Sequence, residues 1–186
     1  MGGGDRDRNG CSRRDVLRAG GLAALGLVLG PRFAFAARTS GRTLPFYCVH
    51  TGESLAVEYF AGGQYRPDGL VAVNELLRDF RTDTQHPIDP RLLDLVFALR
   101  HAVGSRAPVN VVSGYRSRST NAMLRETGHH VATQSYHLKG RALDFFLPDR
   151  SLAQVRRVAL AMRGGGVGYY PASNFVHLDT GPVRSW

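Results

Sequence analysis

Cysteine and lysine are scarce in this chain of 186 residues. Its two cysteines are Cys11 and Cys48, and Lys139 is the only lysine among 24 basic residues. Two cysteines cannot build a disulfide-rich scaffold or a structural zinc site with four thiolates. No apolar run reaches the roughly 20 residues that a membrane-spanning helix needs. The stability of the folded chain must therefore come from an apolar core.

The overall composition is that of a globular protein with a positive charge. Hydrophobic residues make up 43% of the chain and charged residues 21%, which are ordinary values. The formal net charge is +9, which suggests an anionic partner or environment. Nucleic acid and an acidic cell-wall polymer both fit. The basic residues are spread along the chain, so the charge does not choose between them.

The N-terminal segment, residues 1–36, has the features of an export signal. A basic start precedes a short apolar run of 12 residues, 19–30, and residues 34–36 read Ala-Phe-Ala, a small-residue cleavage site. The stretch Ser-Arg-Arg-Asp-Val-Leu-Arg at 12–18 resembles the twin-arginine signal. We expect a mature start at Ala37 and a periplasmic location. An ordinary secretion signal or an uncleaved anchor are the alternatives.

Removing this signal changes the charge and the cysteine count. Residues 1–36 contain six arginines and three aspartates, so the remaining chain carries a formal charge of +6. Cys48 is then alone and cannot form an internal disulfide. The export route also disfavours nucleic acid as a partner.

Hydrophobic periodicity in residues 37–186 predicts one α+β domain with no internal linker. Ser151 and Gln154 form a capping box at the start of one helix, and an apolar stripe with Leu77 and Phe80 extends another helix to Arg81. The predicted strands are 44–50, 55–60, 109–113, 141–147, 167–170 and 175–179. The predicted helices are 68–81, 91–103, 119–127 and 151–163, with a polar loop at 129–139.

Two predicted strands each carry an ionisable side chain in an apolar frame. Asp144 alternates with Leu143 and Phe145, and His177 alternates with Val176 and Leu178. Alternation along a strand puts each ionisable group on the face opposite its apolar neighbours. A carboxylate in such surroundings is costly unless it is paired or binds a metal. The two strands therefore suggest a shared polar site.

His137, in the loop before Asp144, completes a set that suits zinc. Two imidazoles and one carboxylate bind Zn²⁺ and leave a fourth position for a water that the ion activates. The alternatives are an Asp144 that pairs with an arginine and a His177 that is a core histidine. Cys48 with His50 could also indicate a thiol nucleophile, although a buried small residue is the simpler interpretation.

The segment Ser135 to Asp144 reads Ser-x-His-x-x-Gly-x-Ala-x-Asp. It resembles the signature of the M15 zinc peptidases, which include D-alanyl-D-alanine carboxypeptidases and murein endopeptidases. The stretches 166–170 and 175–184 are similar to the murein endopeptidase K-like branch. The resemblance covers roughly residues 44–186. It implies a mainly antiparallel sheet with flanking helices, as in the Hedgehog and D-Ala-D-Ala peptidase folds.

The resemblance also implies roles for individual residues. His137, Asp144 and His177 are the implied zinc ligands, and Arg116 is the implied partner of the substrate carbonyl oxygen. The carboxypeptidases have a glutamate as general base three residues before the last histidine, where this chain has Asn174. Asp179 is our candidate for the base, because it shares a strand face with His177. Alternatively, Asp179 orients His177 without touching the water.

The predicted activity is therefore zinc-dependent hydrolysis of peptide cross-links in peptidoglycan, with stem peptides as the substrate and a monomeric enzyme. A D-alanyl-D-alanine carboxypeptidase is the nearest alternative. A wall-binding module that keeps zinc but has lost catalysis is another, motivated by the missing glutamate. We expect no nucleic acid partner and no membrane span once the signal is cleaved.

Overall fold

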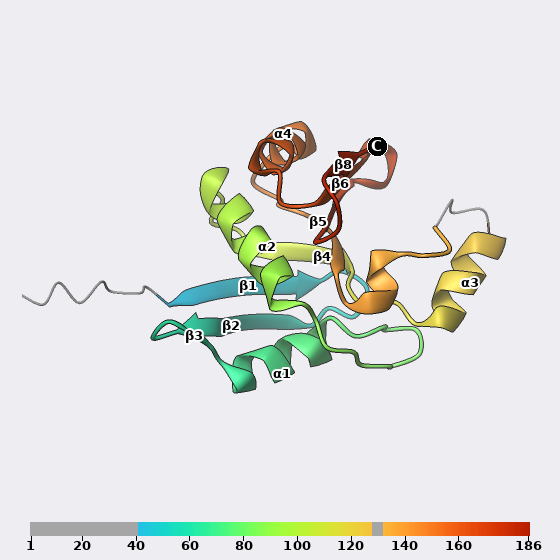
Figure 1. Ribbon diagram of the computed structural model, residues 1–186, viewed down its shortest axis with the longest axis horizontal. Helices are drawn as coiled ribbons and strands as arrows, with labels where there is room; N and C mark the ends of the chain where they lie inside the picture. Colours follow the sequence, from blue (N-terminus) through green and yellow to red (C-terminus); the bar gives the residue numbers. More distant parts are fainter. Residues whose placement is uncertain (1–40, 128–131) are drawn as a thin grey trace, which may run out of the picture. The chain divides into compact units, whose positions relative to one another are not determined.

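The computed structural model describes residues 41–127 and 132–186 (Figure 1). The predicted export signal and residues 129–131 of the predicted polar loop lie outside the described residues. Everything described belongs to one compact unit. Among its helices, none is both long and apolar enough to cross a bilayer.

Within the described residues, one sheet of eight strands forms the centre of the domain, in the order β3-β2-β1-β4-β5-β7-β6-β8. Five of its seven strand pairings are antiparallel, and the pairs β1–β4 and β6–β8 are parallel. The predicted α+β class with a mainly antiparallel sheet is confirmed. The strands are β1 (Arg42–Cys48), β2 (Ser54–Ala61), β3 (Gln64–Tyr65), β4 (Val109–Ser113), β5 (Ala142–Phe146), β6 (Gly166–Tyr170), β7 (Phe175–Asp179) and β8 (Arg184–Ser185).

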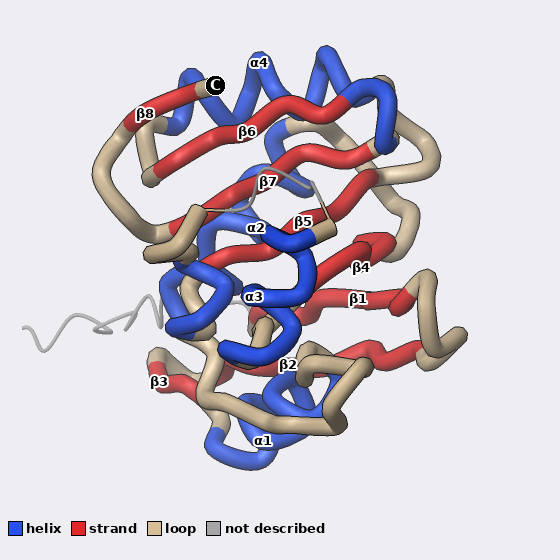
Figure 2. Tube along the Cα trace, turned by 90° about the vertical axis from the view of Figure 1, so that its right-hand side faces the viewer, coloured by secondary structure: helices blue, strands red, loops and turns tan. Residues whose placement is uncertain are grey.

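Four α-helices and two short 3₁₀ helices of the described part of the chain flank the sheet. Figure 2 shows α3 in front of the sheet, with α2 and α4 behind it. Ser151 caps α4 by accepting a hydrogen bond from the Gln154 N–H, as the sequence predicts. The helices are α1 (Pro67–Leu76), α2 (Pro90–Ala102), α3 (Arg118–Glu126), η1 (Tyr136–Lys139), α4 (Leu152–Met162) and η2 (Pro171–Ser173).

The register of β5 against β7 separates the core from the polar site. Leu143 pairs with Leu178 and Phe145 with Val176, and all four are buried in the apolar core. Asp144 lies directly opposite His177 in the same ladder. Because side chains alternate along each strand, the core pairs face one side of the sheet and the ionisable pair faces the other.

Three sequence predictions for the elements need correction. α1 ends at Leu76 and not at Arg81, because the Leu77 carbonyl accepts a hydrogen bond from Tyr115 and the Asp79 side chain binds backbone outside the helix. The two-residue strands β3 and β8 were not predicted. Residues 136–139 form a 3₁₀ helix within the predicted loop.

Cys48 is buried at the end of β1, where its thiol donates a hydrogen bond to the Leu76 carbonyl (3.5 Å). Burial raises the pKa of this thiol to about 11. The thiolate is the nucleophilic form of cysteine, so a nucleophilic role for Cys48 with His50 is not supported. The interpretation as a buried small residue is confirmed.

Candidate metal centre

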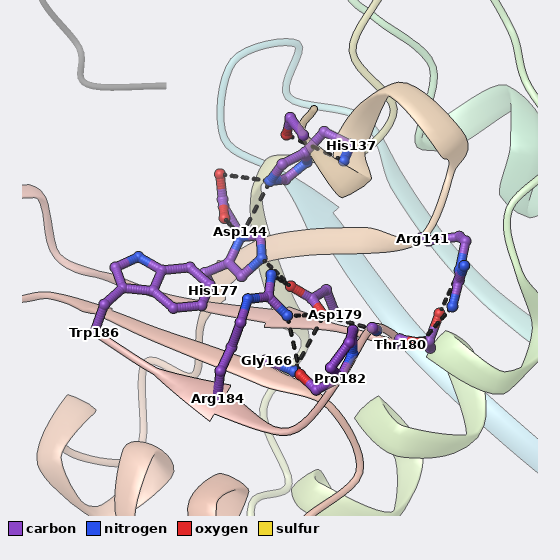
Figure 3. Close-up of polar contacts among 12 residues, drawn as sticks. His137, Arg141, Asp144, Gly166, His177, Asp179, Thr180, Pro182, Arg184 and Trp186 are labelled. Carbon is purple, nitrogen blue, oxygen red and sulfur yellow. Dashed lines mark hydrogen bonds and ion pairs between the residues drawn. The ribbon is translucent and has the colours of Figure 1, made fainter. Parts of the chain in front are cut away.

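The structure brings together the side chains of His137 and Asp144, from neighbouring segments of the chain, and His177, which lies 33 residues beyond Asp144 (Figure 3). One ligand atom from each lies within 4.8 Å of the other two, and all three residues are buried. His177 Nδ1 is 2.7 Å from Asp144 Oδ1 and 3.2 Å from His137 Nε2. His137 Nε2 is also 3.2 Å from Asp144 Oδ2. Three potential ligand atoms thus point at one place.

The residues around His137 explain the spacing of the signature. The Ser135 hydroxyl accepts a hydrogen bond from the His137 N–H (3.3 Å) and begins η1. Gly140 ends η1 in the left-handed conformation, with φ of 61°. A Cβ at Gly140 would lie 2.1 Å from the Pro87 carbonyl oxygen, so only glycine fits there. These two residues hold the loop that presents His137 to Asp144.

Hydrogen bonds on the far side of each imidazole fix which nitrogen carries the lone pair. His137 Nδ1 is 2.7 Å from the Gly114 carbonyl oxygen, which can only accept, so Nδ1 carries the proton. His177 Nε2 is 3.0 Å from Asp179 Oδ2 and carries its proton for the same reason. The remaining nitrogens, Nε2 of His137 and Nδ1 of His177, are the two that face Asp144. Both rings are therefore oriented as metal ligands.

The electrostatics of the site favour a cation between these groups. Burial alone would raise the pKa of Asp144, yet the neighbouring imidazoles hold it below its ordinary value, so Asp144 is ionised. Burial lowers the pKa of His137 and keeps that ring neutral. Burial acts on His177 in the same direction, but hydrogen bonds to Asp144 and Asp179 raise its pKa to about 9. A positive charge at His177 Nδ1, as a second imidazole proton or as a metal ion in its place, is thus stabilised beside Asp144 and Asp179.

Asp179, which the sequence suggests as the general base, lies behind His177 (Figure 3). Its side chain is fully buried and accepts hydrogen bonds from the Gly166 N–H (3.1 Å), the Gly181 N–H (2.8 Å) and Arg184 (2.6 Å). It contacts the His177 nitrogen that faces away from Asp144. Asp179 also does not line the cavity next to the site. This geometry favours the alternative in which Asp179 orients His177.

Arg116 lies beside the three potential ligands and is 7% exposed. Its Nη2 donates to Asp144 Oδ2 and to Ser113 Oγ, both at 3.2 Å. Its backbone N–H donates to the His137 carbonyl (3.2 Å), which ties the β4–α3 loop to η1. The buried Nε has no hydrogen-bond partner among the described residues. A buried donor without a partner is costly unless a ligand meets it.

A cavity of about 340 Å³ opens onto the site. His137, Asp144, His177 and Arg116 line it, together with aromatic side chains such as Tyr170 and Trp186. The Trp186 ring packs against His177, with 5.2 Å between ring centroids, and its Nε1 donates to the Tyr170 hydroxyl (2.6 Å). The site is therefore buried but reachable by a ligand of peptide size.

Sequence reasoning missed two contributors to the site, Arg184 and Asp79. Arg184 entered the sequence analysis only as the end of the stretch 175–184, whereas the structure pairs it with Asp179 behind His177. Sequence reasoning placed Asp79 within a helix, whereas its carboxylate accepts the N–H of Ser117, the residue after Arg116. Neither contact leaves a signal in local periodicity, because both depend on chain segments that meet only in the fold.

Asn174 stands where the carboxypeptidases have their glutamate, and its backbone explains the residue type. It lies in the exposed turn between β6 and β7 with φ of 56°. Asparagine adopts this left-handed conformation more readily than most residues with a side chain. Among the described residues that line the cavity, Asp144 is the only one with an acidic side chain.

Comparisons with known proteins agree on one family. The family model described as Peptidoglycan L,D-endopeptidase MepK matches residues 36–186. The Peptidoglycan L,D-endopeptidase MepK of Escherichia coli strain K12 is 45% identical over 182 residues, covering 97% of this chain and 100% of that protein. The Probable peptidoglycan L,D-endopeptidase MepK of Haemophilus influenzae is 42% identical over 178 residues, covering 94% and 95%. The chain therefore belongs to the peptidoglycan L,D-endopeptidase MepK family.

Proposed function

We propose that this protein is a zinc-dependent endopeptidase that hydrolyses peptide cross-links of peptidoglycan, at an amide between an L and a D centre. The observation that carries the proposal is the convergence of His137, Asp144 and His177 in the lining of one cavity. The names of its relatives, L,D-endopeptidases of peptidoglycan, support the substrate and the bond. Stem peptides are thus the expected partner.

The donor set fits zinc. Two ligands about 2.0–2.1 Å from a tetrahedral ion lie about 3.3 Å apart, close to the 3.2 Å between His137 Nε2 and His177 Nδ1. Two nitrogens and one carboxylate oxygen are typical of catalytic zinc sites, which keep one position open. When bound, Zn²⁺ supplies a Lewis acid that polarises the scissile carbonyl and activates water.

The protein's own residues would stabilise the substrate carbonyl oxygen and orient the metal ligands. Arg116 directs its buried guanidinium toward the cavity beside Asp144 and would stabilise negative charge on the carbonyl oxygen. Asp179 and the Gly114 carbonyl hold the two imidazoles in the ligand tautomer. In this arrangement Asp179 is a positioning residue, which replaces its assignment as the base.

The test uses cross-linked muropeptide dimers incubated with the purified protein, with added Zn²⁺ or with a chelator. We expect monomers only when metal is present, with activity restored by Zn²⁺ after chelation. Release of terminal alanine without monomers would instead identify a carboxypeptidase. Binding of dimers without any product would identify a wall-binding module, and either result would overturn the proposal.

We further propose that residues 1–36 direct twin-arginine export to the periplasm and are removed before Ala37, and that the mature enzyme is a monomer. The arginine pair, the short apolar run and the Ala-Phe-Ala site support this. Replacement of both Arg13 and Arg14 by lysine should keep the uncleaved precursor in the cytoplasm. N-terminal sequencing of exported protein and its sedimentation in solution test the other two statements.

A further inference from the structure

The segment between α1 and α2 carries a second arginine to the cavity. Asp79, in this segment, is 2% exposed. Its Oδ1 accepts the Arg81 N–H (3.0 Å) and its Oδ2 accepts the Ser117 N–H (2.9 Å). Since Ser117 follows Arg116, one buried carboxylate ties together the backbone beside both arginines.

Two further contacts lock this segment to the β4–α3 loop. The Tyr115 N–H donates to the Leu77 carbonyl (2.8 Å). A Cβ at Gly114 would lie 2.5 Å from that same carbonyl oxygen, so the two backbones touch. Gly114 in turn accepts the His137 imidazole proton. The backbone at Arg81 is therefore fixed relative to both Arg116 and the metal centre.

The Arg81 guanidinium is held but not neutralised. It lies over the Phe80 ring, 4.3 Å from its centroid, and Phe80 stacks on His50 at 4.6 Å. Arg81 is exposed and lines the cavity. Within residues 41–127 and 132–186 no carboxylate pairs with it. Arg78, three residues earlier, pairs with both Glu53 and Asp83.

The cavity therefore has more positive than negative charge. Arg81, Arg116 and Arg184 line it. Arg184 is paired with Asp179, and Asp144, the one acidic side chain among the described lining residues, already contacts Arg116 and both imidazoles. Among the described residues, Arg81 is therefore the lining arginine whose charge is not compensated. A bound divalent metal would add further positive charge. The complementary ligand is anionic, and the planar guanidinium of an arginine matches a carboxylate with two parallel hydrogen bonds.

We propose that Arg81 is a specificity-determining residue that binds a free carboxylate of the stem peptide, while Arg116 faces the scissile carbonyl. This inference rests on the proposed function, since it names the substrate group that the cavity selects. Stem peptides with that carboxylate free are the preferred substrates, and stem peptides with it amidated are poor ones. Phe80 and Asp79 are the residues that hold Arg81 in position.

The experiment compares two substrates and three variants of the full chain loaded with Zn²⁺. The substrates are a cross-linked muropeptide dimer with free carboxylates and the same dimer with its carboxylates amidated. The variants are Arg81→Gln, Arg81→Lys and, as a matched control, Arg106→Gln. Arg106 is an exposed arginine before β4, whereas Arg116 follows the other end of that strand. Zinc content and melting temperature show whether each variant is folded and loaded.

We expect Arg81→Gln to lower kcat/KM on the free dimer by about 10- to 100-fold, mainly through KM, since a hydrogen-bonded charge pair is lost. Amidation should cost the wild type a similar factor and should cost Arg81→Gln almost nothing further. Arg81→Lys should be intermediate, and Arg106→Gln should keep the wild-type preference. The inference is overturned if Arg81→Gln has the same kcat/KM on the free dimer as the wild type. It is also overturned if amidation lowers kcat/KM of Arg81→Gln by the same factor as it lowers that of the wild type.

A binding measurement separates this inference from the proposed function. If the zinc-loaded wild type cleaves neither dimer, the endopeptidase proposal fails. Calorimetric titration of the metal-free protein with each dimer then measures Kd and still tests the role of Arg81. Tighter binding of the free dimer by the wild type than by Arg81→Gln supports it, and equal Kd values reject it.

Discussion

The potential metal ligands and Arg81 all line the cavity, but they differ in how far their polar atoms already have partners within the protein. The potential metal ligands His137, Asp144 and His177 are buried, and each has a further fixed partner in Gly114, Arg116 or Asp179. Arg81 is exposed, and only its backbone and one face of its side chain are held. The geometry for metal binding is therefore set by the fold alone, whereas substrate recognition is left to a side chain that completes its hydrogen bonds only on binding.

The largest effect is expected from replacing a potential metal ligand. We expect Asp144→Asn to lose zinc and more than about 1000-fold in activity, because the ion's stabilisation of the transition state is worth several kcal/mol. Elemental analysis and dimer cleavage measure both. Asp68→Asn, at a side chain that is 72% exposed, is the control and should change neither. An Asp144→Asn protein with normal zinc content would refute the proposed site.

Arg116 shares features with both the potential metal ligands and Arg81, because it contacts Asp144 and also lines the cavity. Arg116→Lys should lower kcat by about 100- to 1000-fold, the usual loss when one oxyanion donor is removed. KM and zinc content should change little, since the ammonium can still neutralise Asp144. If the loss appears only in KM, Arg116 binds the ground state and does not stabilise the transition state.

Substitution of Asp179 tests whether the residue that hydrogen-bonds to His177 affects zinc affinity. Asp179→Asn keeps a hydrogen-bond acceptor for His177 but loses its charge, so zinc affinity should fall by about 10- to 100-fold. Competition with a chelator measures this loss. At saturating Zn²⁺ the variant should recover most of its activity. A variant that is fully loaded with zinc and still inactive would support proton transfer by Asp179 and contradict its positioning role.

The smallest effect is expected at Asp79, which affects stability. The Asp79 carboxylate accepts the N–H groups of both Arg81 and Ser117. The amide N–H₂ of an asparagine cannot accept one of these two hydrogen bonds, so Asp79→Asn should lower the free energy of unfolding by about 1–3 kcal/mol. Urea denaturation measures the cost. Asp83→Asn is the control, because that carboxylate is 82% exposed and in the left-handed conformation that asparagine tolerates.

The same substitution makes a prediction about pH. Burial alone would raise the pKa of Asp79, but hydrogen bonds from Ser117 and Thr120 hold it below the ordinary 3.8. The charged form is therefore favoured in the folded protein. Its contribution to stability is complete above about pH 4 and is lost as the pH falls further. The difference in stability between wild type and Asp79→Asn should shrink in that acid range, and a constant difference would argue against it.

The sequence predicts what depends on local pattern. Alternation along residues 141–147 and 175–179 predicts that Asp144 and His177 share a face, and the register of β5 and β7 places them opposite one another. The signature supplies His137, and Ser135 and Gly140 have the conformations that its loop needs. That these residues bind zinc remains a prediction.

The rest depends on contacts between distant segments. The apolar stripe through Leu77 and Phe80 continues a helix in the sequence, but the Leu77 carbonyl and the Asp79 carboxylate bind Tyr115 and Ser117. Those competing hydrogen bonds end α1, and no local propensity contains them. The pairing of Arg184 with Asp179 likewise follows from β8 joining the edge of the sheet. The residues that sequence reasoning missed are thus those that support the site from other segments of the chain.

The burial of Cys48 has a consequence for where this domain can work. Its thiol is hydrogen-bonded within the core and is protonated at any physiological pH. No covalent cross-link contributes to the described fold, and burial largely shields the sulfur from oxidants and from other thiols, since Cys48 is only 7% exposed. The domain can therefore complete its fold under reducing conditions and keep it unchanged after transfer to an oxidising compartment.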